Sequence, residues 1–328
     1  MKGFQKPFQL GSLTLPNNII IAPMAGCSNK TYRQMIYEYS PGLIFCEMVK
    51  IEALVRKDFH TLQYLEYDNN NRPIGAQICG SNPSVAAIAA KMIEDLGFDI
   101  LDINCGCPVT KVIKDKSGSG MLLYPDLIED LLNKVVESVN IPVTIKIRMG
   151  WDNENIIAEK LVEIAEKAGA AAITIHGRTR SQGYKGKANW EIIRLCKQKA
   201  KNIKIIGNGD IWSAQDAFDM FMETGCDGVM LARGALGRPW LIQEIKEMFY
   251  KEKKSEMKKN HVFLHLLKHF ELILKNTEQE RKALFNMRQV GCWYLKSFEG
   301  AKTLRLAINT ASTPKEIISI LKDFQEKI

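Results

Sequence analysis

The sequence predicts a (β/α)8 barrel of the TIM type followed by a small helical bundle. Short runs rich in β-branched residues recur about every 30 residues up to residue 240, which is the length of one strand–helix unit. The runs are apolar on both faces, as in a parallel sheet covered on both sides. Beyond residue 245 the runs stop and only helical patterns follow.

Eight such runs are expected to form the strands of the barrel, because their number and spacing match eight parallel strands that are each followed by a helix. A doubly wound open sheet is the alternative. That fold usually has a glycine-rich turn after its first strand, whereas Pro23-Met24-Ala25-Gly26 stands there and no GxGxxG or P-loop pattern occurs. The predicted strands are 18–24, 43–49, 73–78, 100–106, 143–149, 172–178, 204–210 and 228–234.

Helical spacing of apolar residues fills the intervals between the runs. Helices are predicted at 83–96, 125–139 and 156–168, and Gly97, Gly169 and Gly225 stand where a helix C-terminus needs a left-handed residue. The last quarter is expected to contain helices at 261–276, 278–298, 301–311 and 314–327, preceded by a lysine-rich linker or exposed helix end at 251–259. We therefore divide the chain into a catalytic barrel, 1–245, and a helical domain, 246–328.

Composition excludes several classes of protein. The chain has 328 residues, of which 46% are hydrophobic and 25% charged, so it has enough apolar material for a core. The apolar runs are shorter than the roughly 18 residues of a membrane span, and the N-terminus does not resemble a signal peptide. The eight cysteines are scattered without two spaced pairs, which argues against disulfides and a zinc site. We expect a cytoplasmic monomer without a metal.

Positive charge is concentrated at the C-terminal end. Lys and Arg exceed Asp and Glu by 8 in the whole chain, and nearly all of this excess falls beyond residue 244. A net positive segment attached to a nearly neutral barrel indicates a polyanionic partner. Trp293 and Tyr294 are candidates for stacking on nucleic-acid bases, although Trp293 in the bundle core is the alternative interpretation.

Polar residues interrupt most of the predicted strands near their carboxyl ends. These ends meet at one face of a barrel, where active sites lie, and polar groups within apolar runs need partners. Each of these residues taken alone could serve a structural role. Their shared position at the strand ends is what indicates a common functional pocket. The residues concerned are Met24, Glu47, Gln77, Asn104, Cys107, Lys146, Arg148, His176, Arg178, Asn208, Asp210 and Arg233.

The last two strand ends indicate the kind of ligand. Barrels often bind phosphate with the loops after strands seven and eight, where Gly207, Gly209 and Gly234 permit close approach to backbone N–H groups and Arg233 adds a cation. A lysine and a glutamine at the mouth suit a flat heteroaromatic ring with imide edges. Together these features are typical of a site for flavin mononucleotide (FMN).

Several motifs resemble those of tRNA-dihydrouridine synthases, most closely the bacterial B-type branch. They occur in the family's order between about residues 10 and 245, whereas the C-terminal part resembles the family only in length, helical character and charge. The motifs are IAPMAGCSNKTYR (21–33), DINCGCPVTKV (102–112), SGSGMLL (117–123), VTIKIRMGW (143–151), ITIHGRTRSQGYKGKANW (173–190), IIGNGDI (205–211) and MLARGALGRPW (230–240).

The resemblance implies an FMN-dependent barrel and a helical RNA-binding domain that together reduce a uracil base in RNA. It places the catalytic cysteine at Cys107, and substrate contacts at Asn104 and Arg178. The roles of His176 and Arg178 are open between cofactor and substrate. The implied FMN contacts are Pro23, Met24, Ala25, Gln77, Lys146, His176, Asn208, Gly209, Asp210, Ala232 and Arg233.

Two positions depart from the family pattern. Ser28-Asn29 stands where Thr-Asp is typical, and Cys105 occupies a position that is usually apolar. The second departure places another thiol two residues before Cys107, so the assignment of the catalytic cysteine needs a test.

The implied reaction adds a hydride from flavin N5 to C6 of the uracil and a proton from the Cys107 thiol to C5. NADPH or NADH would then reduce the flavin again in the same pocket. Because the target base lies in folded RNA, it must be flipped out or already unstacked. tRNA is the expected substrate, with rRNA as the alternative.

Two other functions compete with this hypothesis. A small-molecule FMN dehydrogenase for dihydroorotate or another pyrimidine would share the flavin site, but it would not need a basic helical domain. A non-catalytic RNA-binding barrel is the other alternative, and the complete set of site residues argues against it.

Overall fold

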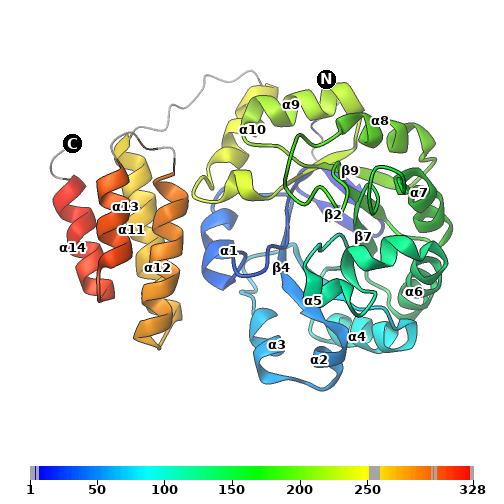
Figure 1. The fold of residues 1–328 in the computed structure, drawn as a ribbon, viewed down its shortest axis with the longest axis horizontal. Helices are drawn as coiled ribbons and strands as arrows, with labels where there is room; N and C mark the ends of the chain where they lie inside the picture. The colour runs from blue at the N-terminus through cyan, green and yellow to red at the C-terminus, as the bar shows by residue number, and fades with distance from the viewer. Residues whose placement is uncertain (1–3, 5–6, 251–258, 297, 299–300, 326–328) are drawn as a thin grey trace.

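The computed structural model describes residues 4, 7–250, 259–296, 298 and 301–325. Eight parallel strands form a closed barrel in the order β10-β3-β4-β5-β6-β7-β8-β9, which confirms the barrel and excludes the open sheet (Figure 1). The strands are β3 (Ile19–Ile21), β4 (Leu43–Lys50), β5 (Ile74–Cys79), β6 (Ile100–Cys105), β7 (Val143–Arg148), β8 (Ala172–His176), β9 (Lys204–Asn208) and β10 (Gly228–Leu231).

Helices surround the barrel. They are α1 (Lys30–Tyr37), α2 (Ile51–Val55), α3 (Phe59–Tyr64), α4 (Pro83–Asp95), α5 (Thr110–Ile113), α6 (Pro125–Ser138), α7 (Ala158–Lys167), α8 (Trp190–Lys199), α9 (Ala214–Thr224) and α10 (Leu241–Tyr250), with 3-10 turns at Gly118–Leu123 and Arg233–Ala235. Gly97, Gly169 and Gly225 have φ of +83°, +85° and +66°, as predicted for residues that end helices. A continuous layer of Ile, Leu, Val and Ala lies between strands and helices.

The predicted strands begin correctly but several end too late. Strand β3 stops at Ile21 and β10 at Leu231, whereas the sequence runs extend to 24 and 234. Pro23 has no N–H with which to continue a ladder. The polar residues after each strand therefore belong to the loops, which leaves their side chains and backbone groups available at the barrel mouth.

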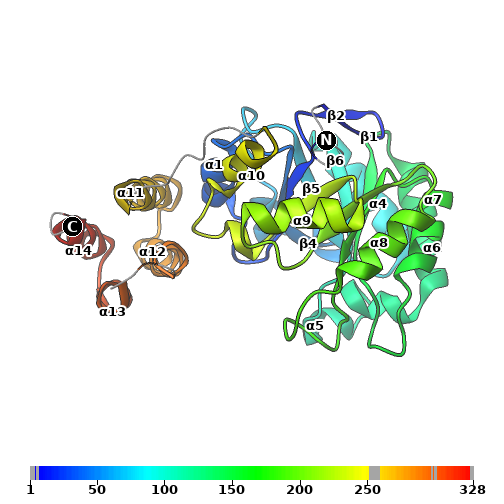
Figure 2. The same ribbon diagram turned by 90° about the horizontal axis from the view of Figure 1, so that it is seen from above.

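A hairpin that the sequence analysis missed covers the opposite end of the barrel. Strands β1 (Phe8–Leu10) and β2 (Leu13–Leu15) pair antiparallel around Gly11, and Phe8, Leu10 and Leu15 are buried against inward-facing strand residues. Figure 2 shows the hairpin at one end of the barrel and α5 at the other. Because the hairpin closes the bottom, ligands have access from the mouth.

The C-terminal helices form a bundle with its own core. They are α11 (Lys259–Asn276), α12 (Glu280–Tyr294), α13 (Ala301–Thr310) and α14 (Pro314–Gln325), as the sequence predicted. Residues 251–258 of the predicted linker lie outside the described residues. The expected boundary at 245/246 falls within α10, whose Ile242, Ile245 and Phe249 are buried in the barrel layer.

The bundle rests against α1 and against the segment 237–240 that precedes α10 (Figures 1 and 2). Lys268 pairs with Glu38 at 2.7 Å, and Asn276 Nδ2 donates to Gln34 Oε1 at 2.8 Å. A Cβ on Gly237 would lie 2.4 Å from the backbone of Trp293, so this loop needs glycine to approach α12. The bundle is therefore docked on the barrel by specific contacts.

Docking changes the interpretation of the two candidate stacking residues. Tyr294 is only 5% exposed and packs against Trp240 and His269, so the expectation that it can stack on a base is wrong. Trp293 is half-buried, and its ring meets the edge of Tyr32 on the barrel. Both residues hold the bundle together or hold it against the barrel.

Candidate active site

A cavity of about 460 Å³ opens at the carboxyl ends of the strands. Of the residues predicted for the site, all but Glu47, Gly207 and Arg178 line this mouth cavity, and Arg178 lines a neighbouring one. The residues brought together are Pro23, Met24, Ala25, Gln77, Asn104, Cys107, Lys146, His176, Asn208, Gly209, Asp210, Ala232 and Arg233. Arg148, which the strand pattern had also singled out, lines it as well, and so does Met48.

A buried hydrogen-bonded chain lies below the mouth cavity. Asp102 accepts from Gln77 Nε2 at 2.7 Å and from Thr144 Oγ1 at 2.6 Å, and Gln77 Oε1 accepts from Asn104 Nδ2 at 2.8 Å. Strand register produces this chain, because Gln77 and Thr144 both lie directly opposite Asp102 on the neighbouring strands. Burial raises the pKa of Asp102 to about 6, although the hydrogen bonds from Gln77 and Thr144 lower it in part.

The chain ends at the loop that carries Cys107. Asn104 Oδ1 accepts from the backbone N–H of Gly106 at 3.1 Å and of Cys107 at 2.9 Å. Ser119 holds the other side of the loop, since its N–H and hydroxyl donate to the Cys107 carbonyl at 3.0 and 2.8 Å. Asn104 therefore positions the cysteine loop, a role that the sequence analysis did not assign to it.

The two thiols of the Cys105–Cys107 segment lie in different environments. Cys105 is fully buried behind the strand, with its sulfur 3.8 Å from that of Met121, and burial raises its pKa well above the ordinary value. Cys107 is partly exposed and lines the mouth cavity. Only Cys107 is placed to meet a ligand there.

Lys146 contributes a cation to the mouth cavity. Its Nζ donates to Asn208 Oδ1 at 3.1 Å, and Asn208 is held in turn by donating to the Met230 carbonyl at 2.7 Å. Burial and the neighbouring Arg148 lower the pKa of Lys146 to about 8, while Asp102 opposes the shift. Lys146 thus stays mostly protonated at pH 7, with its ammonium directed by Asn208.

His176 is neutral at pH 7. Burial lowers its pKa well below the ordinary value, and the charges of Lys146, Arg148, Arg178 and Arg233 lower it further. A neutral imidazole offers one donor and one acceptor. The four cations that surround it make the mouth attractive to anions.

Arg178 and Asp210 form a buried pair that holds a loop. Arg178 is 3% exposed, and its guanidinium donates to Asp210 Oδ2 at 2.8 Å and to the carbonyls of Lys185 and Gly186. Asp210 also accepts from the Ala188 N–H at 2.7 Å. The Arg178 guanidinium, predicted to contact the substrate, thus holds a loop, and the Asp210 carboxylate already accepts hydrogen bonds from Arg178 and Ala188.

The three glycines expected near phosphate differ in their roles. Gly209 has φ of +117°, and a Cβ there would lie 2.9 Å from His176, so this turn needs glycine. Gly207 is packed against Met220, and a Cβ on Gly234 would lie 2.1 Å from the Ile211 carbonyl. Gly209 and Gly234 line the mouth cavity, whereas Gly207 does not and serves packing.

The sequence analysis missed two aromatic residues at the rim. Tyr184 and Trp212 are 59% and 39% exposed, and the Arg233 guanidinium lies 4.5 Å from one ring centre and 5.0 Å from the other. Lys296 of the helical domain lies 5.5 Å from the Trp212 ring centre. Their signal was available, because Tyr184 lies within the quoted motif 173–190 and Trp212 directly follows the quoted motif 205–211.

The departure at Ser28-Asn29 keeps the local structure. Ser28 Oγ accepts from the Met24 N–H at 2.9 Å, and Asn29 caps α1 by accepting from the Tyr32 N–H at 2.9 Å. In the part of the chain that the structure describes, no three His, Cys, Asp or Glu side chains are grouped to hold a metal. None of the described helices is long and apolar enough to cross a bilayer.

Comparison with known proteins identifies relatives along nearly the whole chain. The family described as "Dihydrouridine synthase (Dus)" matches residues 20–328, so the similarity includes the helical domain as well as the barrel. The chain is 36% identical to tRNA-dihydrouridine synthase B of Pasteurella multocida over 96% of this chain and 95% of that protein. It is 37% identical to a probable tRNA-dihydrouridine synthase 1 of Synechocystis over 95% and 88%, respectively.

Solved structures are similar in fold. Histamine dehydrogenase from Rhizobium sp. 4-9 superposes with a TM-score of 0.58 at 13% identity and covers 81% of this chain and 50% of that one. Morphinone reductase gives a TM-score of 0.51 at 15% identity, covering 79% and 94%. At these identities the likeness concerns the barrel architecture alone.

Proposed function

The chain belongs to the dihydrouridine synthase family, and from this premise we propose that it reduces specific uridines of tRNA to 5,6-dihydrouridine. The observation that carries the proposal is the mouth cavity, where Cys107, Asn104 and Lys146 converge from neighbouring strands. A proton donor, an amide and a cation are the groups that reduction of a uracil ring requires. We also propose that the enzyme acts as a cytoplasmic monomer.

The residues of the mouth cavity suit FMN as the bound cofactor. When bound, FMN would supply hydride transfer between a reduced nicotinamide and C6 of uracil. Lys146 would stabilise negative charge on the reduced ring, and Gln77 with neutral His176 offers hydrogen bonds to its edge. The backbone around Gly209 and Ala232 and the Arg233 guanidinium would hold the phosphate.

Proton delivery is assigned to Cys107. When its thiol gives the proton to C5 while the hydride arrives at C6, the C5–C6 double bond becomes a single bond and the ring stays neutral. Asn104 holds the Cys107 loop through its oxygen, and its second amide hydrogen is free to donate to a uracil carbonyl. The Asp102–Gln77 chain fixes the orientation of the Asn104 amide, since Gln77 Oε1 accepts from it.

The helical domain is proposed to bind the tRNA. It carries most of the excess positive charge, and α12 approaches the mouth loop, where Gln289 Nε2 donates to the Gly26 carbonyl at 3.2 Å. Arg288 is less suited to RNA than its charge suggested, because its guanidinium donates to the Ala311 carbonyl at 2.8 Å. Exposed cations such as Lys282 and Lys302 remain available for phosphates.

Mass spectrometry of nucleosides tests the proposal. tRNA and rRNA from cells with and without the gene are digested separately, and the purified enzyme is then supplied with FMN, reductant and tRNA from the deficient cells. We expect dihydrouridine to be lost from tRNA and restored in vitro. Loss from rRNA alone, or activity on free pyrimidines that persists without RNA, would replace the proposal with one of the alternatives.

A further inference from the structure

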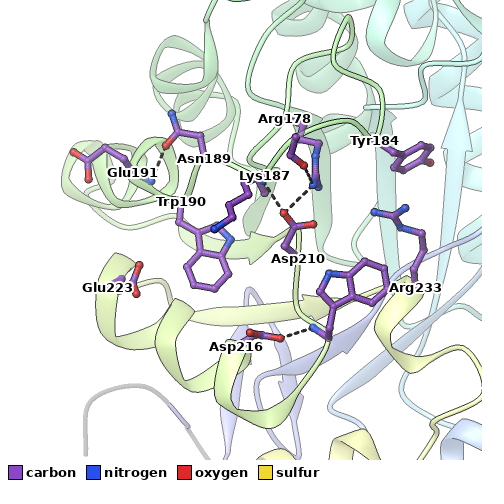
Figure 3. A pocket seen from close by; sticks show the side chains of 13 residues that line it. Arg178, Tyr184, Lys187, Asn189, Trp190, Glu191, Asp210, Asp216, Glu223 and Arg233 are labelled. Atoms are coloured by element: carbon purple, nitrogen blue, oxygen red, sulfur yellow. Dashed lines mark hydrogen bonds and ion pairs between the residues drawn. The ribbon is translucent and has the colours of Figure 1, made fainter. Parts of the chain in front are cut away.

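A second cavity of about 840 Å³ lies beside the mouth cavity, next to the first turns of α8 and α9. Figure 3 shows Trp190 and Lys187 on one side of Asp210 and Arg233 on the other. We call this space the side cavity. The proposed reaction at Cys107 does not use it, since neither Cys107 nor Asn104 lines it.

The side cavity joins the mouth cavity at a shared wall. Tyr184, Asp210, Trp212 and Arg233 line both spaces. Trp212 and Arg233 also line a third cavity of about 690 Å³, which faces the helical domain through Trp293 and Lys296. A ligand can therefore leave the mouth in two directions, toward the RNA-binding bundle or away from it into the side cavity.

One lysine of the side cavity has no partner among the described residues. Asp216 caps α9 by accepting from the N–H groups of Trp212 and Ser213, and Glu191 pairs with Arg194. Lys187 is exposed and forms no ion pair or hydrogen bond within the described ranges of the chain. Glu223, also unpaired there, is exposed at the wall of the cavity.

We propose that the side cavity binds the adenosine diphosphate half of the reduced nicotinamide dinucleotide, with the adenine against Trp190 and phosphate at Lys187. The inference rests on the proposed function, which needs such a reductant at the flavin. Indole faces stack on adenine, and Glu223 offers an acceptor to ribose hydroxyls. An aromatic face, a cation and a carboxylate of the cavity then each have a counterpart in one ligand.

The arrangement favours the dinucleotide over RNA as the occupant. The mouth cavity must hold the flavin with either a nicotinamide or a uracil upon it, so the remainder of a dinucleotide has to lie in a connected space. The tRNA is expected to approach across the helical domain, which borders the third cavity and contributes none of its described residues to the side cavity. Reductant and RNA would thus share the mouth but leave it on opposite sides of Trp212 and Arg233.

Calorimetric titration of the FMN-loaded enzyme with ADP tests the site directly. Lys187→Ala is expected to weaken ADP binding about tenfold, which corresponds to about 1.4 kcal/mol, because it removes a charge-assisted contact. Lys185→Ala is the matched control, since Lys185 is an exposed lysine of the same loop whose side chain does not line the cavity. It is expected to bind ADP like the unaltered enzyme.

Rapid-mixing measurements of the two half-reactions distinguish the reductant from RNA. In Lys187→Ala the apparent Kd of NADPH or NADH for flavin reduction should rise about tenfold, whereas that of reduced nicotinamide mononucleotide, which lacks the adenosine half, should not change. Reoxidation of the reduced flavin by tRNA should keep its concentration dependence. Equal ADP affinity in all three proteins, or a defect confined to the tRNA step, would overturn the assignment.

The proposed function fails separately from this inference. If the unaltered enzyme's flavin is reduced by neither the dinucleotide nor the mononucleotide, or its reduced flavin is not reoxidised by tRNA, then the reaction has been misassigned. The ADP titration still reports on the side cavity in that case.

Discussion

Replacing Asn104 tests whether it holds the Cys107 loop. Its side-chain oxygen accepts the N–H groups of Gly106 and Cys107 at 3.1 and 2.9 Å. A typical hydrogen bond contributes about 1 kcal/mol net, so Asn104→Ala should lower the free energy of opening this loop by about 2 kcal/mol. The open population then rises about 30-fold, since each 1.4 kcal/mol is a factor of ten.

Hydrogen exchange read by mass spectrometry measures this directly. The amides of Gly106 and Cys107 should exchange about 30-fold faster in Asn104→Ala, because each loses its acceptor. Reoxidation of the reduced flavin by tRNA should slow as well, since the thiol is no longer held in one position.

Asn104→Asp is the matched variant. It keeps an acceptor for both amides but loses the donor to Gln77 Oε1. The backbone N–H groups of Gly106 and Cys107 should therefore stay protected from exchange. Any slowing of flavin reoxidation by tRNA would then report the loss of the Asn104 side-chain N–H donors. Unchanged exchange in Asn104→Ala would refute the proposed loop-holding role.

Three further predictions concern the buried carboxyl, the thiol pair and the helical domain. Burial raises the pKa of Asp102 from 3.8 to about 6, so its charge destabilises the fold above pH 6 and ceases to do so as the pH falls toward 4. Asp102→Asn should therefore raise the free energy of unfolding, measured in urea, by up to about 3 kcal/mol at pH 8 but not at pH 4. A gain that does not depend on pH would contradict this reasoning. Cys107→Ala should slow flavin reoxidation by tRNA about 100-fold or more without loss of FMN, whereas Cys105→Ala should not, and equal effects would contradict the assignment of the acid. Lys282→Ala should weaken tRNA binding and reduce its log–log salt dependence by about 1, with Lys160→Ala on α7 as the control; an unchanged slope would remove Lys282 from the RNA contact.

Much of the site was predictable because a barrel brings strand ends together. Once 30-residue spacing indicated eight parallel strands, polar residues at their carboxyl ends had to meet at one mouth. This reasoning placed Gln77, Lys146 and Asn208 in one cavity, although they lie far apart in the sequence. The family resemblance then assigned chemistry to the same residues.

Contacts between distant side chains were not predictable from those patterns. The loop-holding roles of Asn104 and Arg178 depend on partners that only the closed barrel supplies. Likewise, the sequence suggested that Tyr294 could stack on a base, but the structure buries its side chain in the bundle core. Local sequence does not reveal which face of a helix another domain will cover.

The sequence by itself determined the barrel, the helical domain and the residues of the mouth, because alternation of apolar runs and helical patterns is a local property of the chain. The tertiary structure decided which of two nearby thiols meets the ligand, burying Cys105 and leaving Cys107 at the cavity. It also decided that the side cavity exists, since Trp190 and Trp212 come from different strand–helix units. Cavities and burial depend on how separate units pack, and no single segment contains that information.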